Sequence, residues 1–168
     1  ATSNGESSGR DGVTTAGGAA GSELVPGADP GWSHADQSVA LGKTVHLITK
    51  KDHVAVDVTV TNVQRDASAV PATLLPTQGH RFVAVSYTVH ALGPSTYEQP
   101  ATAQLCRLYT ADGTAYRPSY FMAGNGQALD AYPLVAPGTT VTGWVLFEIP
   151  INSEPSSVSY SPTAEWRL

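Results

Sequence analysis

The five histidines have the widest scope for chemistry in this sequence, because imidazole is both a common metal ligand and an acid–base group. His80 and His90 bracket one alternating segment, and ten residues at about 3.3 Å each would separate them by roughly 33 Å, too far to share an ion. His46 and His53 could face each other across a turn, with Asp52 beside them. A metal needs three or four ligands, and the local supply is thin. The sequence therefore predicts no metal site.

Nucleophilic chemistry has as little support. Ser33 and His34 are sequence neighbours, whereas a nucleophile and its base must meet in space with a third, orienting group. The sequence has no nucleophile elbow, zinc-protease motif or phosphate loop. Cys106 is the single cysteine, so an internal disulfide is excluded; we expect a small, buried, unreactive residue, with an intermolecular disulfide as the alternative. We predict no enzyme, no catalytic residues and no cofactor.

Trp144 poses a question of register. It lies in "APGTTVTGWVLFEIP", residues 136–150, on the face that also carries Thr142 and Glu148. Glycine inside a strand often marks a bulge or the close approach of another group. A bulge at Gly143 would turn Trp144 into the core, which is our expectation; the alternative is an exposed aromatic contact.

Short segments with a period of two must position these side chains, because helical periodicity is nearly absent. Strands are expected near residues 39–48 and in residues 53–63, 81–90, 104–118, 136–150 and 156–168. The pair Asp112-Gly113 predicts a tight hairpin, and Pro162 an edge position or a break. Seven or eight strands without a crossover helix favour an all-β fold, a two-sheet antiparallel immunoglobulin-like β-sandwich.

Composition divides the chain in two. All 13 aromatic residues lie at Trp32 or beyond, whereas half of the 16 glycines lie in residues 1–31. Those residues are too poor in large apolar side chains to offset the entropy of ordering, so we expect a flexible Gly/Ala/Ser-rich tether followed by one domain, residues 32–168. Such a lead, starting at Ala1, is typical of an exported protein whose signal has been removed. The low charge, with no basic stripe, disfavours nucleic acid as a partner.

Three segments together resemble a known family. "GHRFVAVSYTV", "LYTADGTAY" and "LVAPGTTVTGWVLFEIP" are similar, in order, to the motifs of a telokin-like, immunoglobulin-like domain of unknown function. That family occurs in secreted proteins and lipoproteins of Gram-positive bacteria, actinobacteria especially, and is similar to a secreted mycobacterial antigen. The resemblance runs from about Gly42 to Tyr160, and the last motif is its specific part. It implies an extracytoplasmic β-sandwich and supplies no catalytic residues.

Residues 116–133 are the best candidates for contact with a partner, since sandwich loops often carry function. They gather aromatic and soft apolar side chains around a Gly-Asn-Gly hinge: Tyr116, Tyr120, Phe121, Met122 and Tyr132. The alternative is a loop that folds its own aromatics over the core. We expect a non-enzymatic binding module for a protein or cell-envelope component, secreted or held at the membrane by a lipid anchor upstream. Two alternatives remain: an accessory subunit of a membrane complex, and a metal-binding or enzymatic protein with a site assembled from distant strands.

Overall fold

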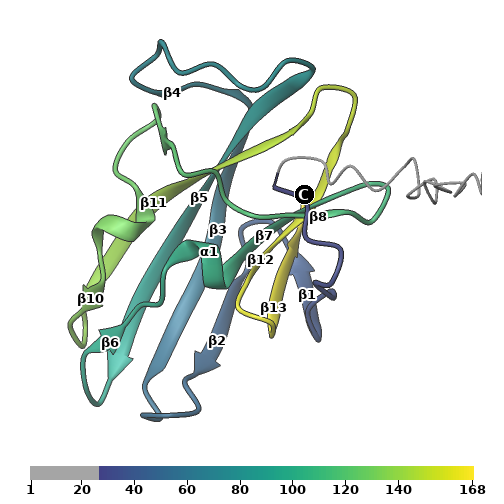
Figure 1. Cartoon of the computed structure of the whole chain (residues 1–168). Coiled ribbons are helices and arrows are strands. Elements are labelled where there is room, and N and C mark those ends of the chain that lie inside the picture. Colours follow the sequence, from purple (N-terminus) through teal and green to yellow (C-terminus); the bar gives the residue numbers. More distant parts are fainter. Residues whose placement is uncertain (1–26) are drawn as a thin grey trace, which may run out of the picture.

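The computed structural model describes residues 27–168, and two β-sheets packed face to face form its body (Figure 1). The first sheet contains five strands in the order β1 (Gln37–Ala40), β13 (Ala164–Arg167), β12 (Pro155–Tyr160), β7 (Cys106–Thr110) and β8 (Ala115–Tyr116). The second contains four strands in the order β11 (Thr140–Pro150), β5 (His80–Gly93), β3 (Ala55–Ala67) and β2 (Thr44–Ile48). The predicted all-β sandwich is confirmed. One pairing departs from the antiparallel pattern, because β1 runs parallel to β13.

Short elements close the ends of the sandwich. Two ribbons of two-residue strands pair β6 (Tyr97–Glu98) with β10 (Leu134–Val135), and β4 (Ala69–Val70) with β9 (Met122–Ala123). The helical pieces in residues 27–168 are also short: α1 (Thr102–Leu105) and the 3₁₀ turn η1 (Leu129–Ala131). The expected surface connection before Pro133 therefore folds into β9 and η1, which both lie against β11.

The core lies between the two sheets and follows the predicted alternation. Every second residue of β5 faces inward, so Val83, Val85, Tyr87 and Val89 are fully buried. From the opposite sheet, Trp166 stands edge-on to Tyr87, with ring centroids 6.5 Å apart, and its indole N–H donates to the Lys43 carbonyl at 2.7 Å. Burying rings of this size supplies much of the apolar area that stabilises a domain without disulfides.

The Asp112-Gly113 hairpin forms as predicted. Cys106–Thr110 and Ala115–Tyr116 pair antiparallel, and Gly113 adopts φ +85°, a conformation that costs glycine little and other residues more. The Asp112 carboxylate accepts hydrogen bonds from the Thr110 hydroxyl at 2.5 Å and the Thr114 amide at 3.0 Å. Pro162 lies in the turn between β12 and β13, so it breaks the strand there as expected.

The expected tether, residues 1–31, lies mostly outside the described residues, but residues 27–29 pair with the β7–β8 hairpin. The Asp29 amide donates to the Ala115 carbonyl at 2.8 Å, and the Arg117 amide to the Gly27 carbonyl at 2.7 Å. Farther along, the Arg107 guanidinium stacks 3.8 Å from the centre of the Trp32 ring. Residues 27–29, which the sequence predicts to lie in the tether, thus pair with the sheet in the described structure.

The bulge expected at Gly143 is wrong. The register between β11 and β5 is regular across Gly143, and Trp144 stays on the outer face of the sheet, opposite Ser86. There it is half-buried over a second apolar cluster that includes Phe82 and Leu146. The missing side chain at Gly143 instead allows the backbone of η1 to approach.

Candidate functional site

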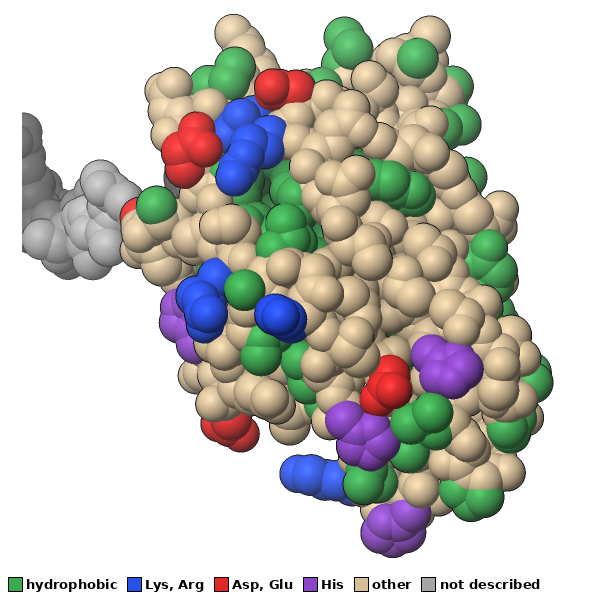
Figure 2. Space-filling view, turned by 180° about the vertical axis from the view of Figure 1, so that it is seen from behind, with side chains coloured by type: hydrophobic (Ala, Val, Ile, Leu, Met, Phe, Trp, Pro, Cys, Tyr) green, Lys and Arg blue, Asp and Glu red, His purple; other side chains and the backbone are tan. Residues whose placement is uncertain are grey.

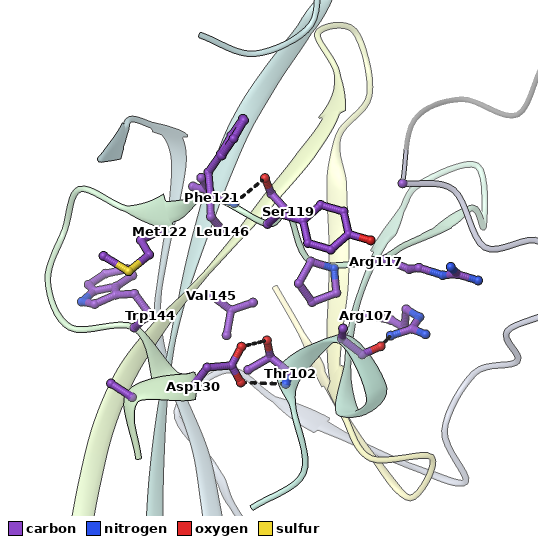
Figure 3. Close-up of a pocket in the computed structure, with 16 residues that line it drawn as sticks. Thr102, Arg107, Arg117, Ser119, Phe121, Met122, Asp130, Trp144, Val145 and Leu146 are labelled. Atoms are coloured by element: carbon purple, nitrogen blue, oxygen red, sulfur yellow. Dashed lines mark hydrogen bonds between the residues drawn. The ribbon is translucent and has the colours of Figure 1, made fainter. Parts of the chain in front are cut away.

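A groove of about 670 Å³ opens beside the outer edge of β11 (Figure 3). Two segments border it because each forms a hydrogen bond with that edge. The Ser119 amide donates to the Leu146 carbonyl at 2.7 Å, and the Trp144 amide donates to the Gln127 carbonyl at 2.8 Å. Val145 and Leu146, at this edge of β11, line the groove between the two segments. Backbone hydrogen bonds to the long strand β11 thus position the two segments that border the groove.

One wall of the groove consists of aromatic and flexible apolar side chains. Phe121, Met122 and Trp144 lie along it, and Tyr120 stands fully exposed beside them. Phe121 is anchored by an edge-to-face contact with Phe82, at 6.3 Å between ring centroids, yet 39% of its surface remains exposed. Such rings are already positioned, so binding them to another surface costs little additional conformational entropy.

The opposite wall is polar, and its charged groups are paired. The Asp130 carboxylate accepts two hydrogen bonds from Thr102, from the amide and the hydroxyl, each at 2.8 Å. Arg107 and Arg117 both reach the Asp29 carboxylate, at 3.1 and 3.3 Å. Partial burial alone would raise the pKa of Asp29, but hydrogen bonds and charge attraction from the two arginines hold it below its usual value. These hydrogen bonds and ion pairs hold the polar wall in place. The carboxylates of Asp29 and Asp130 are both occupied by them and do not stand free beside a nucleophile.

The structure brings three of the five predicted contact residues together. Tyr120, Phe121 and Met122 line the groove, and β9 pairs Met122 with Val70, which is also exposed. We call these four residues, Val70 with 120–122, the aromatic patch. Tyr116 lies in the core at 2% exposure, so its ring is not available to a partner. Tyr132 is half-buried after η1 and does not line the groove.

Sequence reasoning missed Val70 and the place of Trp144. Val70 belongs to the proline-rich connection after β3, where nothing in a single sequence shows that it pairs with residue 122. Trp144 was assigned to the core, whereas its ring lies in the groove wall, close to Gly126. Its position on the polar face of β11 was the signal that pointed to this location.

Two of the histidines flank one carboxylate, that of Asp57, and the others lie elsewhere. His46 lies opposite Asp57 in the β2–β3 register and bonds its carboxylate at 2.8 Å, whereas His53 lies in the turn beyond. His90 lies across from Asp57 on the other side and bonds the Thr140 hydroxyl at 2.7 Å. Figure 2 shows histidine side chains close to an acidic one on the back of the molecule. In residues 27–168 no three His, Cys, Asp or Glu side chains come close enough to hold a metal ion.

Two further groups could suggest nucleophilic chemistry. Glu165, nearly buried, accepts hydrogen bonds from the Ser157 hydroxyl and from the His34 ring, the latter at 2.9 Å. The carboxylate stands between serine and histidine here, whereas activation of a serine needs the histidine in the middle. Cys106 is fully buried, and burial raises the pKa of its thiol above the ordinary value, which disfavours the reactive thiolate.

In the described part of the chain no helix has the length and apolar character needed to cross a membrane. The aromatic patch lies at the end of the sandwich where β4 and β9 pair, and the groove runs from it along the outer edge of β11.

The sandwich is similar to two solved bacterial structures. The first is MPT63, a secreted protein from Mycobacterium tuberculosis, with 22% identity, a TM-score of 0.59, and coverage of 81% of this chain and 100% of that one. The second is a conserved hypothetical protein from Bacillus anthracis, with 18% identity, a TM-score of 0.52, and coverage of 77% and 94%. At these identities the likeness concerns the fold alone.

No curated protein sequence matches the chain. A family model described as a domain of unknown function, DUF4352, matches residues 47–167, from β2 through β13. This match spans both sheets of the sandwich and contains every strand of the three motifs on which the resemblance rested. The chain belongs to the DUF4352 family of domains of unknown function.

Proposed function

We propose that this protein is a non-enzymatic, extracytoplasmic binding module that contacts a protein or envelope component through the aromatic patch and the adjoining groove. The observation that carries the proposal is the cluster of exposed apolar side chains at that end of the sandwich. Tyr120 is fully exposed, and Met122, at 53%, and Val70, at 47%, lie directly opposite each other on β9 and β4. Clustered apolar surface of this kind marks interaction sites on soluble domains.

The chemistry of the patch fits a protein partner. Tyrosine, tryptophan and arginine are the side chains that most often dominate binding energy at interfaces. The groove joins Tyr120 and Trp144 on one wall with Arg117 at the rim, where more than half of the guanidinium side chain is exposed. A partner with an apolar side chain for the groove and a carboxylate for the rim would match both features.

A role without catalysis is supported by the state of the polar groups. The groove carboxylate of Asp130 is occupied by Thr102, Asp29 is held by two arginines, and the Cys106 thiol is buried away from solvent. Catalytic groups are instead expected to be accessible, with a base in reach of a nucleophile. These three groups stabilise the wall and the core.

The extracytoplasmic location is part of the proposal and is supported by the glycine-rich lead and by the fold likeness to a protein described as secreted. The second candidate is an accessory subunit of a membrane complex. In that case the groove, which Gly27 helps to line, would contact a membrane protein.

Site-directed crosslinking tests the proposal in the cells that make the protein. A photoreactive phenylalanine analogue replaces Tyr120 in one variant and Ile151, an exposed apolar residue on the β11–β12 turn, in a matched control. We expect discrete adducts on irradiation from position 120 and none from position 151. Adducts of equal yield from both positions, or none from position 120, would overturn the assignment of the patch.

A further inference from the structure

A second pocket, distinct from the groove, opens between the two sheets at the end where the β2–β3 and β12–β13 turns lie (lower part of Figure 1). It has a volume of about 550 Å³. Its apolar wall is contributed by β2 and β3, by the segment around α1 and by the β12–β13 turn, and consists of Leu47, Ile48, Val56, Pro100, Leu105 and Pro162. We call it the interlayer pocket.

The inner part of the interlayer pocket is lined by two tyrosines whose polar atoms are already satisfied. The hydroxyls of Tyr97 and Tyr160 are 2.7 Å apart, and the Tyr160 hydroxyl also donates to the Gln99 side chain at 3.3 Å. Both tyrosines are almost fully buried. A ligand that enters this far therefore meets ring faces and aliphatic carbon, with few free hydrogen-bonding groups, so its inner part must be apolar.

The rim of the interlayer pocket has the opposite character. It carries two ammonium groups, Lys50 and Lys51, and two carboxylates, Asp52 and Glu98. None of the four takes part in an ion pair among residues 27–168, whereas Arg65, Arg81, Arg107 and Arg117 all do. Charges of both signs thus stand around the mouth with no partner inside the described domain.

The backbone around the mouth is also unusual. In the described residues only two side-chain-bearing residues adopt positive φ, His53 at +52° and Ser161 at +61°. They lie in the two turns that border the pocket, and Ser161 is fixed there by a bond from its amide to the Leu105 carbonyl at 2.9 Å. Conformations of this kind persist where the surrounding structure holds them, and they gather at ligand clamps.

We propose that the interlayer pocket binds a single-chain amphiphile with a zwitterionic head group. The apolar wall takes the chain, and the lysines and carboxylates of the rim take the phosphate and the ammonium of the head. At about 30 Å³ for each water-sized group, the volume accommodates on the order of 15–20 heavy atoms, enough for a medium-length acyl chain and the part of the head group next to it. A macromolecular occupant is disfavoured because the mouth leads into a cavity of small-ligand size between two packed sheets.

The direct test is calorimetric titration of the whole chain with a lysophosphatidylcholine of medium chain length, held below its critical micelle concentration. We expect saturable binding at one site. Dodecyl maltoside and dodecyltrimethylammonium, which keep the chain and change the head, should bind at least tenfold more weakly. Absence of saturable binding overturns the proposal, and equal binding of all three probes overturns the assignment of the head group.

Variants locate the site. Ile48→Asp places a carboxylate on the apolar wall at an exposed position, and Lys50→Glu reverses one charge of the rim. Each should weaken lysophosphatidylcholine binding at least tenfold while the thermal unfolding midpoint stays close to that of the parent. Lys43→Glu, the same charge change on the β1–β2 turn outside the pocket, should leave binding unaltered. If Ile48→Asp binds as the parent does, or Lys43→Glu weakens binding as much as Lys50→Glu, the ligand lies elsewhere.

Discussion

The alpha carbon of Leu129 in η1 lies so close to Gly143 in β11 that a Cβ on the glycine would stand 2.4 Å from it. Real Cβ atoms do not approach other heavy atoms at that distance, so any larger residue forces the two backbones apart. The 3₁₀ turn packs against β11 through this contact, with Leu129 fully buried. The residues on either side of it, Ala128 and Asp130, line the groove.

Gly143→Ala should therefore destabilise the protein. Overpacking a site of this kind typically costs about 1–3 kcal/mol, and we expect the upper part of that range because backbone atoms, which cannot rotate away, receive the new methyl group. Urea denaturation followed by tryptophan fluorescence measures the change. Gly31→Ala is the matched control, since its Cβ would meet nothing within 4 Å, and should shift stability by less than about 0.5 kcal/mol. Equal midpoints for the two variants would contradict the close approach.

Alkaline pH should weaken the fold. Burial raises the pKa of Tyr87 and Tyr160 well above their ordinary value of 10.0, and that of Cys106 above 9.0. The unfolded chain releases these protons at the ordinary values, so above pH 9 it binds fewer protons than the folded state does. The free energy of unfolding then falls by about 1.4 kcal/mol per pH unit for each such group, and below that range it is unaffected by them.

Denaturant titrations at a series of alkaline pH values measure that slope. Tyr87→Phe removes one of the three groups named above. The free energy of unfolding of this variant should therefore fall less steeply with pH, by about 1.4 kcal/mol per pH unit, whatever its stability at neutral pH. A free energy of unfolding that stays flat from neutral pH to about pH 11, where unfolded tyrosines have ionised, would show that these side chains are not buried as described.

Asp29→Asn tests the attachment of the chain ahead of Trp32. Arg107, whose side chain is 5% exposed, would keep its two backbone carbonyl partners and lose its carboxylate. Hydrogen bonds to charged groups contribute about 1.5–3 kcal/mol, and we expect a loss near the lower end because Arg117 is largely exposed. Since the pKa of Asp29 is lowered in the folded state, its contribution is present above pH 3.8 and is lost as the pH falls below that value.

Thermal unfolding at neutral pH compares this variant with Asp36→Asn, which makes the same charge change at an exposed position of the same segment. The midpoint should fall for Asp29→Asn and stay within experimental error for Asp36→Asn. A drop of equal size in both would mean that net charge, and not the pairing with the arginines, sets the effect.

The fold could be predicted because the information for it is local. Alternation places Val83, Val85 and Tyr87 on one face whatever the partner strand is, and Asp112-Gly113 specifies its own hairpin. The parallel pairing of β1 with β13 could not be predicted, since it joins residues such as Val39 and Trp166 that are far apart in the sequence. The attachment of residues 27–31 likewise depends on two arginines whose positions only the folded sheet defines.

The candidate site was predictable only in part for the same reason. Tyr120, Phe121 and Met122 stand together in the sequence, so their clustering required no tertiary knowledge. Tyr116 is four residues away yet faces the core, because the hairpin fixes which side of β8 it occupies. For Trp144 the alternation of β11 alone predicts the outer face of the sheet, which is correct. The bulge that we assumed at Gly143 turned this into a wrong prediction of a core position.

The most direct test of the account is a comparison of partner capture by two matched double variants. Tyr120→Ser with Met122→Ser removes the exposed side chains of the aromatic patch, while Leu41→Ser with Ile151→Ser removes exposed apolar side chains elsewhere. Each protein is used as bait on membranes of the producing cells, and bound proteins are quantified by mass spectrometry. We predict that the patch variant recovers at least tenfold less of the partner protein than the parent and the control variant do. Equal recovery of the same proteins by all three baits would contradict the assignment of the contact surface.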